Sequence, residues 1–111
     1  MRTIYHLVTR QAWEQHPDQP YRASSLDREG FIHCSFAEQV ARSANRFYAT
    51  QAELLLLHID PGKLSSLLRE EPSDSGELFP HIYGSLNRDA VLRVEVLTRD
   101  SDGRWQFSAS G

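Results

Sequence analysis

The sequence contains a single cysteine, Cys34, and no long hydrophobic run. One thiol cannot build the intrachain disulfide framework on which many small secreted domains depend. No apolar stretch approaches the roughly 20 residues that a membrane-spanning helix needs. The N-terminal residues enter a strand-like pattern directly, without the pattern of a signal peptide. We therefore expect a cytoplasmic protein that does not associate with a membrane.

Basic residues are too few and too dispersed to predict a nucleic-acid-binding surface. The 111-residue chain has 12 Lys and Arg residues against 15 Asp and Glu residues, which gives a net charge of −3 with neutral histidines. No cluster of basic residues is longer than a pair, so we expect no nucleic-acid partner. Hydrophobic residues make up 40% of the chain and charged residues 24%, as in globular proteins. We expect one domain spanning residues 1–111, as a monomer or a weak homodimer.

Several familiar catalytic and nucleotide-binding motifs are missing. The sequence has no G-x-G-x-x-G fingerprint, no P-loop and no G-x-S-x-G nucleophile elbow. The histidines lack the close linear spacing that is typical of metal ligands. His6, His33 and His81 could still meet in space as a zinc site, but nothing in their spacing favours this alternative. We therefore expect no metal.

Hydrophobic patterning predicts more strands than helices. Alternation or continuous apolar runs indicate strands over residues 3–8, 31–34, 53–59, 90–98 and 104–107. The run at residues 53–59 is apolar enough to predict a strand covered on both faces. Residues 16–30 have the composition of a loop, with at most a brief strand around Tyr21. A turn at Asp102-Gly103 predicts a hairpin at the end of the chain.

Three helices are expected from their capping residues. Thr9 can cap a short helix, and a capping box of Ser35 and Glu38 begins a helix that runs to about residue 48. Asp60 followed by Pro61 predicts a third helix that stops before residue 72. Helices and strands do not alternate regularly. The pattern therefore favours an α+β fold, with a mixed β-sheet and two or three short helices, over a doubly wound fold.

Residues 30–35 (GFIHCS) place a histidine and a hydroxyl on one face of a short strand. Side chains alternate along a strand, so His33 and Ser35 share a face with Phe31. The capping box gives Ser35 a purely structural alternative role. The same cap would also put its hydroxyl at a helix N-terminus, where free N–H groups favour an anion. We expect His33 to be catalytic and Ser35 to bind ligand.

Residues 79–84 (FPHIYG) repeat this arrangement. His81 and Tyr83 share a face, and the flanking Pro80 and Gly84 indicate a shaped turn. A histidine with a pKa near 6.5 suits proton transfer at neutral pH, so we expect His81 to be catalytic and Tyr83 to bind ligand. Glu71 is close in sequence to this segment and could face the same cleft, although a solvated glutamate at the end of a helix is the alternative.

The remaining histidines and the cysteine have simpler interpretations. His6 lies between apolar residues on the first strand, where a hydrogen-bonded core histidine is the alternative to a ligand-binding one. His16 and His58 belong to no motif, and we interpret His58 as structural. Cys34 alternates to the face opposite His33, so we expect a buried and inert thiol rather than a nucleophile.

Five segments carry a resemblance to a known family. In chain order these are IYHL (residues 4–7), EGFIHCS (29–35), ANRFY (44–48), LLL (55–57) and LFPHIYG (78–84). Together they resemble the small bacterial DUF952 proteins over roughly residues 3–97. That family looks like a compact, divergent relative of the ADP-ribosyltransferase fold, which RNA 2′-phosphotransferases share. The resemblance implies a split, mixed β-sheet around an NAD-binding cleft.

The resemblance also suggests individual roles. In the transferases a residue on the first strand contacts the adenine-side ribose, and His6 occupies the comparable place. The family often has a Trp-Glu pair shortly before its Phe-Pro-His motif. Glu70-Glu71 stands there in this chain, so Glu71 matches the acid and the tryptophan is missing. The glutamate that transferases usually carry near the end of the fold is replaced by His81 and Tyr83, which puts ordinary ADP-ribosyl transfer in doubt.

These observations lead to one main hypothesis and two alternatives. The main hypothesis is a cleft that binds or processes a phosphorylated nucleotide such as NAD or ADP-ribose. In it His33 and the helix after Ser35 hold the anionic group, His81 transfers a proton, and His6 and Tyr83 orient the ligand. The alternatives are a non-catalytic module that binds a small anionic metabolite, and an interaction protein with a vestigial cleft.

Overall fold

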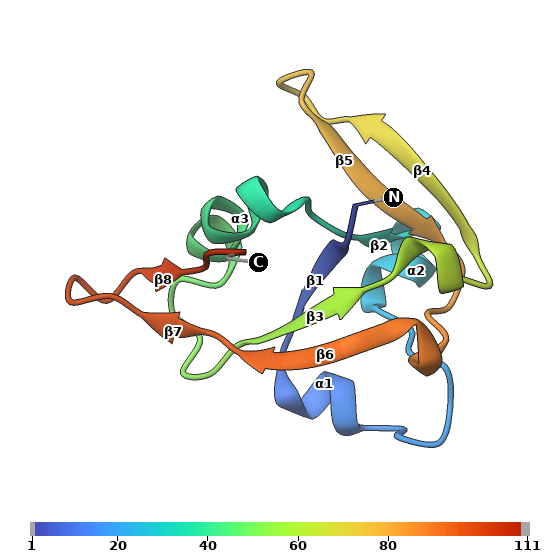
Figure 1. Ribbon diagram of the computed structural model, residues 1–111, viewed down its shortest axis with the longest axis horizontal. Coiled ribbons are helices and arrows are strands. Elements are labelled where there is room, and N and C mark those ends of the chain that lie inside the picture. The colour runs from blue at the N-terminus through green and yellow to red at the C-terminus, as the bar shows by residue number, and fades with distance from the viewer. Residues whose placement is uncertain (1, 110–111) are drawn as a thin grey trace.

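The computed structural model describes residues 2–109 and consists of short helices and strands (Figure 1). The strands are β1 (Ile4–Val8), β2 (Ile32–His33), β3 (Leu55–Ile59), β4 (Leu67–Pro72), β5 (Leu78–Tyr83), β6 (Val91–Val96), β7 (Thr98–Arg99) and β8 (Trp105–Gln106). The α-helices are α1 (Arg10–Glu14), α2 (Ser24–Glu29) and α3 (Val40–Phe47). Single 3₁₀ turns occur at η1 (Ala37–Gln39), η2 (Pro61–Lys63) and η3 (Arg88–Ala90). The fold is therefore α+β, as predicted.

The strands form three small sheets instead of one mixed sheet. Their orders are β1-β3-β6, β2-β5-β4 and β7-β8. Every strand pair in the described part of the chain is antiparallel, so the prediction of a mixed sheet is wrong. Parallel pairs need crossover connections of a dozen or more residues, usually helical. In this chain the helices connect, along the sequence, strands that belong to different sheets or that pair antiparallel, so no parallel pair forms in the described residues.

The first sheet, β1-β3-β6, lies between two apolar layers. One face contributes Ile4, Val8, Leu55, Leu57 and Ile59 to a cluster that also holds Ile32 and Ile82 of the second sheet. The opposite face contributes Tyr5, Leu7 and Leu56 to a cluster with Val40 and Ala44 of α3 and with Trp105 of β8. The central strand β3 is thus covered on both faces, as its continuous apolar run predicts.

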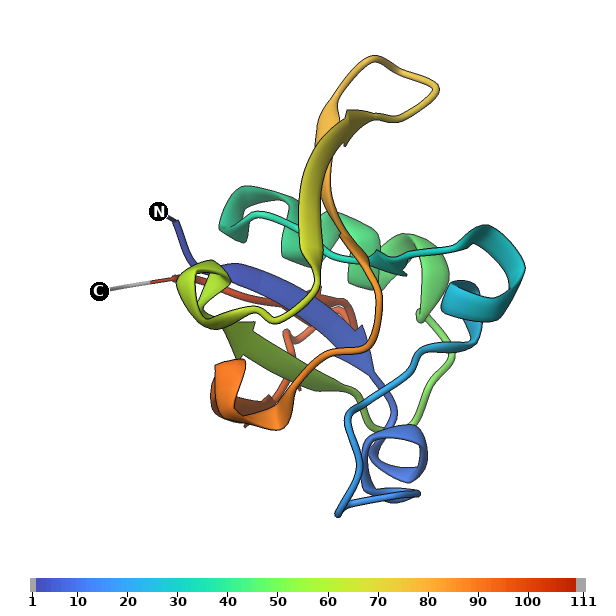
Figure 2. The ribbon, with the colours of Figure 1, turned by 90° about the vertical axis from the view of Figure 1, so that its right-hand side faces the viewer.

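The two larger sheets meet at one isolated bridge between Tyr5 and Ser35. The Tyr5 N–H donates to the Ser35 carbonyl at 2.9 Å, and the Ser35 N–H donates to the Tyr5 carbonyl at 2.7 Å. Beyond this bridge, the β4–β5 hairpin projects from the rest of the chain (Figure 2). Gln39 of η1 binds the turn end of this hairpin, because its side-chain amide donates to the Leu78 carbonyl and to Glu77, each at 2.8 Å.

One predicted helix is missing from the structure, and one helix occurs where a loop was predicted. Asp60 does accept the Gly62 N–H at 2.9 Å, but the turn that it caps ends at Lys63 and is followed by β4. The local cap is outweighed by pairing between all six residues of β4 and β5. The second difference is α2, which lies in the predicted loop and ends at Gly30, whose φ of 89° is left-handed.

Other predictions from helix caps have mixed outcomes. Thr9 caps α1 by accepting the Ala12 N–H at 3.2 Å, as predicted. The capping role of Ser35 is wrong: η1 begins after Phe36, whose N–H donates to Gln39 Oε1 at 2.9 Å. The C-terminal hairpin is confirmed as β7 paired with β8. None of the helices within residues 2–109 is long and apolar enough to cross a membrane.

Candidate functional site

The outer face of the β2-β5-β4 sheet carries the histidines of both motifs together with Tyr83. Ile32, Leu68 and Ile82 point from the inner face into the core. Residues that lie opposite one another in antiparallel strands share a face, and here His33 pairs with His81, which pairs with Arg69. Alternation along the strands then adds the others. We call this surface the sheet-face cluster, and it comprises Phe31, His33, Arg69, Glu71, Phe79, His81 and Tyr83.

Glu71 is the hydrogen-bonding centre of the sheet-face cluster. Its Oε1 accepts the His81 Nδ1–H at 2.8 Å and a short hydrogen bond from the Tyr83 hydroxyl. These bonds, the one from Tyr83 first, lower the pKa of Glu71, while the bond to Glu71 raises the pKa of Tyr83. Glu71 is therefore an ionised acceptor at neutral pH. Because Nδ1 of His81 donates to it, Nε2 is the nitrogen of His81 left to act on a ligand.

The two histidine rings lie around the ring of Phe31. Phe31 stacks on His81 with ring centroids 4.0 Å apart and meets His33 edge-on at 4.8 Å. The His33 and His81 centroids are 5.4 Å apart. His33 Nε2 bonds Glu29 Oε2 at 3.0 Å, and this contact lowers the pKa of Glu29. The His33 side chain is 54% exposed and that of His81 only 12%, so the two histidines differ strongly in solvation.

His6 and Ser35 do not join this surface. His6 is buried, with Nδ1–H donating to the His33 carbonyl at 2.6 Å and Nε2 accepting from the Tyr21 hydroxyl at 2.9 Å. Burial lowers the pKa of His6 to about 4, so the ring is neutral. Ser35 is also buried, at the bridge between the sheets. His6 thus contacts the site through the backbone of His33, behind the exposed face.

The helix on which the predicted anion site rests begins differently in the structure. The Phe36 N–H already has Gln39 as its acceptor, and the first turn is the 3₁₀ turn η1. The cationic groups that face solvent near the histidines come instead from β4. The Arg69 guanidinium lies 5.8 Å from the Tyr83 ring centroid. No group of three or more potential metal ligands occurs among residues 2–109.

Sequence reasoning missed one residue of the sheet-face cluster, Arg69, and one neighbour that bonds to His33 of that cluster, Glu29. Arg69 was assigned to a helix, and only the pairing of β4 with β5 places it opposite His81. Glu29 is four residues from His33 and reaches it because α2 ends at Gly30 and β2 begins immediately afterwards. The Glu29–His33 spacing was visible in the sequence, but the loop assigned to residues 16–30 hid the turn that brings the two side chains together.

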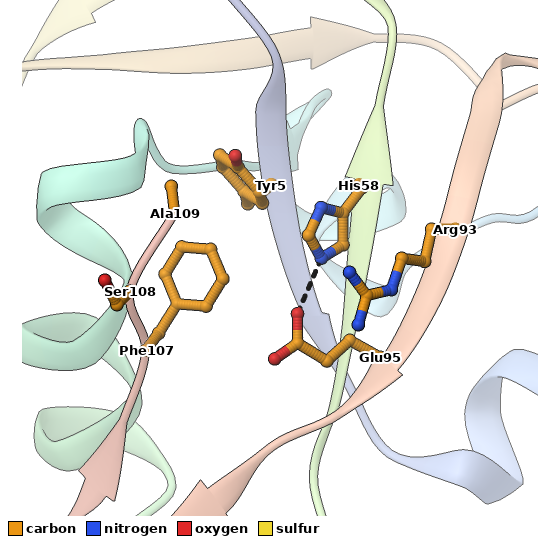
Figure 3. Close-up of a pocket in the computed structure, with 7 residues that line it drawn as sticks. All are labelled: Tyr5, His58, Arg93, Glu95, Phe107, Ser108 and Ala109. Atoms are coloured by element: carbon orange, nitrogen blue, oxygen red, sulfur yellow. Dashed lines mark hydrogen bonds and ion pairs between the residues drawn. The ribbon is translucent and has the colours of Figure 1, made fainter. Parts of the chain in front are cut away.

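A polar hollow lies away from the sheet-face cluster, between β3, β6 and residues 107–109 (Figure 3). His58 Nε2 bonds Glu95 Oε1 at 2.8 Å within it, beside Tyr5 and Arg93. Burial and the nearby Glu95 raise the pKa of Tyr5.

Cys34 lies neither in the sheet-face cluster nor in this hollow. It is buried in the core as predicted, and burial raises the pKa of its thiol.

A family model described as "Protein of unknown function (DUF952)" matches residues 7–94. The chain belongs to the DUF952 family. Protein CC0527 from Caulobacter crescentus, whose crystal structure is known, is 33% identical in sequence to this DUF952 protein. The two structures match with a TM-score of 0.84, and the match covers 94% of this chain and 93% of the other. Its solution NMR structure is 32% identical, with a TM-score of 0.80 over 96% and 93%. No curated protein matches.

Proposed function

We propose that the sheet-face cluster binds a small phosphorylated nucleotide, such as NAD or ADP-ribose, and transfers a proton to or from it through His81. The observation that carries this proposal is the Glu71 carboxylate, which accepts hydrogen bonds from both His81 and Tyr83. A carboxylate behind a histidine fixes its tautomer and ring orientation. Nε2 of His81 is then the atom that transfers the proton, as general acid or base.

The neighbouring side chains suit a ligand with both a ring and a negative charge. Phe31 and Tyr83 offer aromatic surface on which a base can stack. Arg69 and the exposed His33 supply donors for a phosphate or carboxylate. In this proposal the resemblance of the family to the ADP-ribosyltransferase fold extends to this chain, and Glu71 corresponds to the acid of the family's Trp-Glu pair.

A non-catalytic module for a small anionic metabolite is the second candidate. The observation that favours it is the double engagement of Glu71, because a glutamate that stabilises an oxocarbenium-like centre must face the sugar. In this protein one oxygen of Glu71 is already bonded to both His81 and Tyr83. Binding without turnover would need the donors of the cluster but no free carboxylate.

Thermal unfolding with added ligand tests both candidates. We expect NAD, ADP-ribose or inorganic phosphate to raise the melting temperature, since a ligand at 100 times its Kd adds about 2.7 kcal/mol. Small carboxylates complete the panel. His33→Ala and His81→Ala should remove the shift, whereas His16→Ala, at an exposed histidine outside the cluster, should keep it. If no anionic compound shifts the melt at millimolar concentration, the proposed ligand class is wrong.

Turnover separates the enzyme from the binding module. Chromatography of NAD or ADP-ribose after incubation with the protein should show a product that His81→Ala does not form. Ligand-dependent stabilisation without any product would favour the binding module. His33→Ala protein that fails to fold would mean that His33 is structural, and Arg69→Gln then tests the same surface.

A further inference from the structure

The strand β6 is an uncovered edge with an apolar row along it. Within residues 2–109 its only neighbour is β3, and Figure 1 shows it as the outer strand of its sheet. Leu92, Val94 and Val96 alternate along it and are 53%, 42% and 49% exposed. Val94 and Val96 lie opposite Leu57 and Leu55, so this row continues the buried face of the sheet beyond its covered part.

Exposed edge strands are a liability that proteins commonly blunt with Lys, Pro or inward-pointing charges. The segment from Leu92 to Val96 has neither Lys nor Pro, and the bulge in its pairing with β3 falls at its first residue, Leu92. Its two charges lie opposite His58 and Leu56, on the other face from Val94 and Val96. An edge with a full apolar row and unpaired backbone groups is suited to strand addition. The sequence of the strand itself indicates which strand can be added.

The segment Leu92-Arg93-Val94-Glu95-Val96 is complementary to itself when reversed. Antiparallel pairing about a two-fold axis at Val94 sets apolar residues against apolar residues. It also sets Arg93 against Glu95 of the partner subunit, twice. Parallel pairing in register would set arginine against arginine and glutamate against glutamate, which is destabilising. Charge complementarity therefore selects a second copy of this chain in the antiparallel orientation.

We propose that β6 pairs antiparallel with β6 of a second copy of the chain, joining the two β1-β3-β6 sheets into one continuous sheet. Such an interface is isologous, because each copy presents the same strand to the other. The apolar rows of both copies then lie side by side on one face. The other face carries the two Arg93–Glu95 pairs.

The side chains that would form these pairs are accessible. Glu95 uses Oε1 to bond His58 at 2.8 Å, which leaves Oε2 for a guanidinium from the partner subunit. Arg93 is exposed at the mouth of the hollow in Figure 3 and forms no ion pair with any residue of the described chain. The sheet-face cluster lies on a different sheet, so this interface and the proposed function stand or fall separately.

Sedimentation equilibrium over concentrations up to about 1 mM tests the proposal. We expect the wild-type chain to associate reversibly into dimers, since weak complexes have dissociation constants in the micromolar to millimolar range. Val94→Lys places two like charges at the two-fold axis and should abolish the dimer. The control is Phe47→Lys, which also replaces an exposed apolar residue (68% exposed) but lies on α3 and should keep it.

Charge reversal gives a test specific to this register. Arg93→Glu and Glu95→Arg each create two like-charge pairs, so each variant alone should dimerise at least about tenfold more weakly. Mixing the two variants restores opposite charges at both pairs and should restore the dimer. Circular dichroism confirms that each variant is folded, and Arg104→Glu controls for charge change at an exposed site outside β6.

Three results would overturn the proposal. The wild-type chain could remain monomeric at about 1 mM. It could dimerise in a way that Val94→Lys does not affect, which would place the interface on another surface. Finally, the mixture of folded charge-reversed variants could associate no better than either variant alone, which would exclude the antiparallel pairing at Val94.

Discussion

Acidification should destabilise this protein through His6, because the structure holds that ring in its neutral form. Nδ1 must carry the proton, since its partner is the His33 carbonyl, which can only accept. Nε2 then accepts from the Tyr21 hydroxyl. Protonation of Nε2 removes that acceptor and places a charge in the core. Burial, the dominant cause, accordingly lowers the pKa of His6 from 6.5 to about 4.

The sign and size of the effect follow from this pKa. The folded pKa lies below the unfolded one, so the unfolded chain binds a proton first as the pH falls. The stabilising contribution is therefore complete above about pH 6.5 and is lost as the pH falls toward 4. The full difference corresponds to about 3 kcal/mol, of which about 2 kcal/mol is lost by pH 5.

Urea unfolding of wild type and His6→Gln at a series of pH values measures this loss. We expect the wild-type free energy of unfolding to fall more steeply between about pH 7 and pH 5, by about 2 kcal/mol relative to the variant. The other histidines are common to both proteins and cancel in the difference. His16→Gln, at an exposed site, should follow the wild-type curve. Parallel curves for wild type and His6→Gln would refute the reasoning.

Two further predictions concern a turn and the site. Gly30→Ala should lower the free energy of unfolding by about 1 kcal/mol, measured by urea unfolding, because φ is 89° there and no atom within 4 Å adds a clash; an unchanged stability would contradict the need for glycine. Tyr83→Phe removes the first cause of the lowered pKa of Glu71, so the NMR titration of the Glu71 carboxyl should move upward toward its ordinary value. A titration identical to wild type would show that Tyr83 does not bond Glu71 in solution.

Local signals predicted the parts of the fold that local physics controls. The alternation of β1, the apolar run of β3, the Thr9 cap and the hairpin turn before β8 all reflect interactions within or next to the element. The cap predicted at Asp60 forms, but the helix predicted to follow it is a single 3₁₀ turn that gives way to β4. Residues 67–72 are a strand because they pair with β5, and the local sequence does not show that a partner strand will be present.

The arrangement of the candidate site could likewise be predicted only in part. Two-residue periodicity correctly put His81 and Tyr83 on one face, and the structure places His33 across from His81. The same periodicity could not show that the strand leaves the sheet after His33, which carries Ser35 into the bridge with Tyr5. Whether these residues bind or transform a ligand is a separate matter that the proposed experiments decide.

The pairing order of the strands also bears on how the chain acquires its structure during synthesis. β1 finds its partner only when β3 has been made, and β2 waits for β5. The N-terminal half of a growing chain therefore carries two strands with no sheet to join. Such strands expose unpaired edges to other chains. A nascent polypeptide stalled before residue 55 should thus depend on chaperones more than the finished protein does, since β3 is the first strand with which β1 can pair along its whole length.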